Sequence, residues 1–126
     1  GLSMERHVEL ARELDSLRYR GVLIIGSGNI VHNLRMVDWN KLKEPFGYDW
    51  AEEANSKIKD LIISRDLKGL SRVESIGMEM NLAIPTAEHY LPLLYTMGLA
   101  ENDEQHYFFN DVSIGGSLSM CSVVLG

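Results

Sequence analysis

The chain has one cysteine, Cys121, among its 126 residues. A single thiol cannot close an intrachain disulfide, and the apolar neighbours of Cys121 favour a packing role over a reactive one. Chains that do without disulfides are typical of reducing compartments. We therefore expect a cytoplasmic protein.

Basic residues and long apolar runs are also scarce. Lys and Arg number 12 against 18 Asp and Glu, which leaves a formal net charge of −6. Binding to nucleic acid or to an anionic membrane needs clustered positive charge, so neither is an expected partner. No apolar stretch approaches the roughly 20 residues that cross a bilayer, and the N-terminus lacks the basic-then-apolar layout of a signal peptide.

No internal repeat or low-complexity segment divides the chain, and there is no methionine at position 1. Hydrophobic residues make up 45% of the sequence, and this length supports one core. We interpret residues 1–126 as a single domain, or as a fragment cut from a longer protein.

The order of apolar patterns predicts an α/β fold. Residues 22–25 are four consecutive apolar residues, three of them β-branched, as in a strand buried on both faces of a helix-covered mixed sheet. Helical spacing predicts a helix from Ser3, as cap, to about Tyr19, ended by Gly21. The remaining expected elements are a helix over 49–64, short helices within 66–80, a helix entry at 85–89 and β-runs at 106–109 and 117–125.

Proline is rare, and Pro92 falls inside an apolar helical pattern. A proline in a helix interior removes a backbone donor and crowds the preceding turn. Either this helix is kinked, or it begins at Leu91 with Pro92 in its first turn. Both alternatives leave His89 at a helix N-terminus.

The loop that follows residues 22–25 reads Gly26-Ser27-Gly28-Asn29-Ile30-Val31-His32-Asn33. In α/β folds ligands bind outside the carboxyl ends of strands, so this is the expected position of a functional site. Two glycines spaced G-x-G could cradle a phosphate, but the third glycine of the dinucleotide motif is missing and Val31 takes its place. The glycines also suit a sharp turn that aims His32 into a cleft.

His32 and His89 are the candidate functional side chains. An imidazole at a strand end, with the amides of Asn29 and Asn33 near enough to hold its tautomer, suits proton transfer or metal binding. A helix N-terminus disfavours a protonated ring, which leaves His89 a lone pair for a metal. Each histidine could equally be satisfied by local hydrogen bonds, and two ligands do not close a metal site. His7 and His106 have no supporting context and are interpreted as surface residues.

Three strings resemble a known family: GSGNIVHNLR at 26–35, PTAEHYLPLLY at 85–95 and GGSLSMCSVVLG at 115–126. They resemble the C-terminal half of the DOPA-4,5-dioxygenase-type extradiol ring-opening dioxygenases, class III enzymes of the LigB superfamily. The order of the strings and the 57 positions between His32 and His89 also fit. The middle of the chain, roughly 41–84, matches only loosely.

The resemblance implies a non-haem enzyme that opens a catechol-type aromatic ring with O2 and a divalent metal, Fe(II) or alternatively zinc. It implies that His89 is a metal ligand, that His32 is a ligand or an acid/base, and that Asn29 orients the substrate or His32. The family's other metal ligands lie in an N-terminal half that this sequence does not contain. We therefore expect an inactive, weakly metal-binding chain whose partner is that half, and which can self-associate as a homo-oligomer. The alternative is a non-catalytic binding or assembly domain, which predicts that the two histidines lie far apart.

Overall fold

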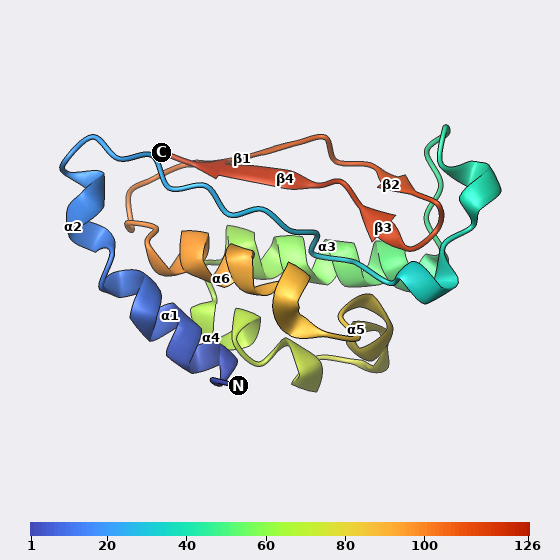
Figure 1. Cartoon of the computed structure of the whole chain (residues 1–126), viewed down its shortest axis with the longest axis horizontal. Coiled ribbons are helices and arrows are strands. Elements are labelled where there is room, and N and C mark those ends of the chain that lie inside the picture. Colours follow the sequence, from blue (N-terminus) through green and yellow to red (C-terminus); the bar gives the residue numbers. More distant parts are fainter.

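The computed structural model describes all residues, 1–126, and has the α/β fold expected from the sequence. Strands lie along one side and helices along the other, with the long helix α3 beneath the strands (Figure 1). The helices are α1 (Met4–Arg12), α2 (Asp15–Arg18), α3 (Asp49–Ile63), α4 (Leu67–Leu70), α5 (Met78–Ala83) and α6 (Leu91–Gly98). Single turns of 3₁₀ helix are η1 (Leu34–Met36), η2 (Trp39–Lys41), η3 (Val73–Ser75) and η4 (Ala87–His89).

The strands form two small antiparallel pairs. β1 (His106–Phe109) pairs with β4 (Ser122–Leu125), with His106 opposite Leu125. β2 (Ser113–Ile114) pairs with β3 (Leu118–Ser119). The run predicted at 106–109 is therefore confirmed, and the one predicted at 117–125 divides into β3 and β4.

Helix α3 supplies much of the core. Its buried apolar residues follow the spacing of one helical face and are Ala51, Ala54, Ile58 and Ile62. The same cluster also contains buried residues of α1, α4, η3, α5 and α6, together with Tyr90 and the segment Ile30–Val31. Cys121 packs against this cluster, and burial raises the pKa of its thiol to about 12, which agrees with a packing role.

The capping residues read from the sequence correctly predicted where the N-terminal helical region begins and ends. The Ser3 hydroxyl accepts a hydrogen bond from the Arg6 amide, as an N-cap does, and Gly21 adopts a left-handed φ of 73°. The predicted helix between them breaks into α1 and α2. Helix α6 begins at Leu91 with Pro92 in its first turn, which is one of the two alternatives for that proline.

The expectation of a strand buried on both faces at residues 22–25 is wrong for this chain. The segment is extended but pairs with no strand, and its side chains face solvent: Leu23 is 81% exposed and Ile25 78% exposed. An apolar run becomes a buried strand only where neighbours pair with its backbone and cover both faces. This chain supplies no such neighbours.

None of the helices combines the length and the apolar character that a membrane crossing requires.

Candidate active site

The glycine loop approaches helix α6 and the turn before it so closely that side chains would not fit. A Cβ on Gly26 would lie 2.7 Å from the Pro92 carbonyl oxygen, and one on Gly28 would overlap the carbonyl of His89. Neither glycine has a positive φ, so the sharp turn expected from the sequence is not the reason for them. They allow the loop backbone to contact the backbone of residues 89–92.

His32 projects from a backbone that is held on both sides. Its amide donates to the Ala83 carbonyl at 2.8 Å, and the residue forms an isolated antiparallel bridge with Leu118. The preceding residue, Val31, is buried in the core. The position of the His32 ring therefore follows from contacts with α5 and β3.

His89 is held by its neighbour in the sequence. It is the last residue of η4, directly before Tyr90, which is fully buried. The Tyr90 hydroxyl donates to the Leu70 carbonyl at 3.0 Å, which ties this turn to α4. The anchored tyrosine fixes the backbone from which the half-buried His89 ring projects.

The structure brings the two candidate histidines together. The ring centroids of His32 and His89 lie 3.7 Å apart, and the ring planes are inclined by 15°, so the imidazoles stack. The two side chains therefore occupy one place in the fold, although they are 57 positions apart in the sequence. The large separation expected for a non-catalytic assembly domain is not observed.

Burial and the neighbouring ring favour a neutral His32. Burial lowers the pKa of His32 most, and the adjacent His89 lowers it further, while Glu88 acts in the opposite direction. A neutral imidazole keeps one nitrogen lone pair, so it can accept a proton or bind a metal. The Glu88 carboxylate is exposed, and its hydrogen bond from the Thr86 hydroxyl lowers its pKa.

Asn29 and Asn33 do not hold the tautomer of His32 with their amide nitrogens. Asn29 Nδ2 donates to the Ser119 carbonyl at 2.7 Å, and Asn33 Nδ2 donates to the Leu82 carbonyl at 2.8 Å. Backbone carbonyls of a packed loop need donors, and these side chains supply them. Both asparagines therefore fasten the loop that carries His32.

The sequence patterns did not indicate that two buried serines support the loop that carries His32. The Ser117 hydroxyl donates to the Asn33 carbonyl at 2.8 Å, and Ser119 accepts from Asn29 through its carbonyl. Both serines belong to the string GGSLSMCSVVLG, so the resemblance already pointed to this segment.

The two histidines are only part of a possible metal site. No group of three or more His, Cys, Asp or Glu side chains gathers where a metal ion could be held. Catalytic metal sites have three protein ligands in the common cases, so two imidazoles fit part of such a donor set. His7 lies elsewhere, with its Nδ1 3.1 Å from the Tyr95 hydroxyl, and His106 lies on β1. Both histidines are half-buried, and neither lies at the His32–His89 pair.

An α/β chain with two stacked histidines on adjoining loops is compatible with acid–base or metal chemistry. No protein-family model matches the chain. It is similar to the 4,5-DOPA dioxygenase extradiol of Escherichia coli (strain K12), with 38% identity over 122 residues, which are 95% of this chain and 44% of that protein. The protein of the same name from Portulaca grandiflora is 31% identical over 103 residues, 78% of this chain and 35% of the relative.

A solved structure shows the same fold. The crystal structure of an uncharacterized protein from Escherichia coli K12 matches with a TM-score of 0.87 and 34% identity, over 97% of this chain and 50% of that one. The chain is thus homologous to part of proteins named extradiol DOPA dioxygenases, and it spans half or less of the length of these relatives.

Proposed function

We propose that this chain is the C-terminal portion of an extradiol ring-opening dioxygenase that acts on a catechol-type aromatic with O2. The similarity to two proteins named 4,5-DOPA dioxygenase extradiol supports the reaction class. The observation that carries the proposal is the stacking of His32 on His89, because a shared site requires these two loops to meet.

We propose that His89 is a ligand of a divalent metal, Fe(II) or alternatively zinc, and that His32 is either a second ligand or an acid/base. Two half-buried imidazoles in contact supply nitrogen donors suited to either ion. When bound, such a metal would supply Lewis-acid stabilisation of the negative charge on the deprotonated catechol oxygens. In this proposal the remaining ligands come from outside these 126 residues, so the chain alone binds metal weakly.

His32 is suited to move a proton. Burial keeps its ring neutral, so a ring nitrogen can take the proton from a catechol hydroxyl as the substrate binds and return it as the ring opens. Asn29 acts indirectly in this proposal. Its amide fixes the loop against β3 and thereby orients His32.

The test measures oxygen uptake and the yellow ring-opened product of catechols with the Fe(II)-loaded full-length protein. We expect His89→Ala to lose metal and activity together. His32→Ala should lower kcat by about 10²-fold or more if the ring transfers a proton. His106→Ala, a histidine on β1 outside the pair, is the matched control and should retain activity.

Two results would contradict the proposal. One is the absence of ring-opened product from the full-length protein. The other is activity that is the same with and without His32. Either result together with no bound metal would favour the non-catalytic assembly domain.

A further inference from the structure

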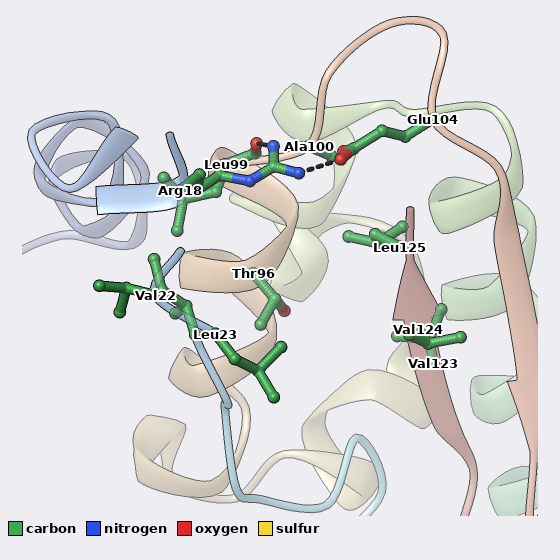
Figure 2. A pocket seen from close by; sticks show the side chains of 11 residues that line it. Arg18, Val22, Leu23, Thr96, Leu99, Ala100, Glu104, Val123, Val124 and Leu125 are labelled. Carbon is green, nitrogen blue, oxygen red and sulfur yellow. Dashed lines mark hydrogen bonds and ion pairs between the residues drawn. The ribbon is translucent and has the colours of Figure 1, made fainter. Parts of the chain in front are cut away.

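A groove separates the extended segment before the glycine loop from strand β4. Residues 22–24 line one wall and residues 123–125 line the other, with the end of α6 between them. Figure 2 shows Val22 and Leu23 on one side and Val123, Val124 and Leu125 across from them. Most of the lining is apolar, and Leu23 and Val124 both remain exposed to solvent.

The backbone along this groove has unused hydrogen-bonding capacity. No N–H or C=O group of residues 23–30 makes a hydrogen bond within the chain. Strand β4 pairs only with β1, so its other edge is free as well. Unpaired peptide groups in an extended apolar segment are typical of a sheet edge that accepts another strand.

The groove is poorly suited to a small molecule. Its volume is about 290 Å³, at the lower limit for ligand pockets, and its charged groups already bond to each other. The Arg18 guanidinium donates to the Glu104 carboxylate and to the Leu99 carbonyl at one end, as the dashed lines in Figure 2 mark. The polar groups that lack a hydrogen-bond partner are the backbone N–H and C=O groups along the groove. A β-strand placed between the two walls can bond to them.

We propose that this groove is the docking site of an apolar β-strand from the half of the relatives that this chain does not match. The strand pairs with residues 23–25 on one side and extends the β1–β4 sheet on the other. The matching fold has the same arrangement over 97% of this chain and contains about as much chain again, which is a source for the strand. The groove is an apolar surface with free backbone groups on both walls, and it can seat part of that length.

The position of the strand has a consequence for the histidine pair. Residues 22–25 run directly into the loop that carries His32, so a strand paired with them extends toward His32 and His89. Provided that the proposed function is correct, this strand is the element that brings further active-site groups to the pair.

The experiment co-expresses the tagged chain with the unmatched half of the E. coli relative, and also joins that half ahead of Gly1 in one polypeptide. Complex formation is measured by size-exclusion chromatography with light scattering, and amide hydrogen exchange is measured for residues 23–25. We expect a one-to-one complex in which these amides exchange at least about tenfold more slowly than in the free chain, in both formats.

Charged substitutions test the site directly. Leu23→Lys and Val124→Lys place a charge in the groove without removing core contacts, because both side chains are exposed in the free chain. Each should weaken the complex at least about tenfold while the circular dichroism of the free chain is unchanged. Ile63→Lys, at an exposed apolar position of α3 outside the groove, is the matched control and should bind as wild type.

Three outcomes would overturn the proposal. In the first, a complex forms but residues 23–25 still exchange rapidly, so the half docks elsewhere. In the second, the chain alone forms a dimer that protects these amides, so the occupant is a second copy. In the third, the amides stay unprotected even in the joined polypeptide. All these measurements omit metal and catechol, so they report on docking alone. If the complex is protected but the Fe(II)-loaded full-length protein forms no ring-opened product, the proposed function is refuted and the docking site remains.

Discussion

Single residues determine how closely the two histidine loops approach. Gly28 contacts the backbone of His89, and the Asn29 amide fastens the same loop to β3. His32 follows three residues later, with its own amide bonded to α5. The stacking of the imidazoles therefore depends on backbone and amide contacts made outside the two rings.

Gly28→Ala should destabilise the chain by about 1–3 kcal/mol, the usual cost of inserting a methyl group into a packed contact. The added Cβ meets a carbonyl oxygen of the backbone, which cannot rotate away as a side chain can. The measurement is the urea unfolding midpoint. Gly126→Ala, where a Cβ meets open space, is the control, and equal midpoints for the two variants would contradict the contact.

At the scale of elements, buried polar contacts connect the long helix to the strands. The hydroxyl of Ser119 on β3 is buried and donates to Asn55 Oδ1 on α3 at 2.7 Å. The same serine accepts the amide of Asn29 through its carbonyl, so α3, β3 and the glycine loop are linked. A buried hydroxyl without an acceptor costs unfolding free energy, so packings in which Ser119 meets Asn55 are favoured over those in which it does not.

Asn55→Ala should cost about 1–3 kcal/mol of unfolding free energy, because it leaves the Ser119 hydroxyl without its acceptor. The double variant with Ser119→Ala should cost less than the sum of the two single changes, since both partners are then absent. Asn81→Ala, an exposed asparagine on α5, is the control. Additive losses in urea denaturation would show that the hydrogen bond carries no coupling.

At the scale of the whole molecule, this chain does not supply the neighbouring strands that a buried strand at residues 22–25 requires. The α/β class is confirmed, yet residues 22–25 lie exposed beside the groove. The histidine pair is likewise a partial donor set. The interpretation of residues 1–126 as a single domain or a fragment, and homo-oligomer formation, stay predictions.

The stability of the metal-free chain should fall as the pH drops below about 6.5, the ordinary pKa of histidine. The pKa of His32 is lower in the folded state, so the unfolded chain binds its proton first, and protonation favours unfolding. This contribution is fully present above the unfolded pKa and is lost as pH falls toward the folded pKa. Urea midpoints at pH 7.5 and 5.5, measured with EDTA, check this.

His32→Gln removes the titrating group and should flatten the dependence between those two pH values. An equally steep loss of stability in His32→Gln would show that another group is responsible.

The sequence alone determined what depends on neighbours within a few positions: the Ser3 cap, the Gly21 end, the apolar stripe of α3 and the choice of His32 and His89 as candidates. Capping and helical periodicity act over three or four residues, so they can be read along the chain. Tertiary structure decided the rest. Rings 57 positions apart stack at 3.7 Å, the loop glycines serve a close contact, and the most strand-like run lies unpaired. Those outcomes depend on which distant segments pack together, and strand formation at residues 22–25 requires a neighbour that these 126 residues do not supply.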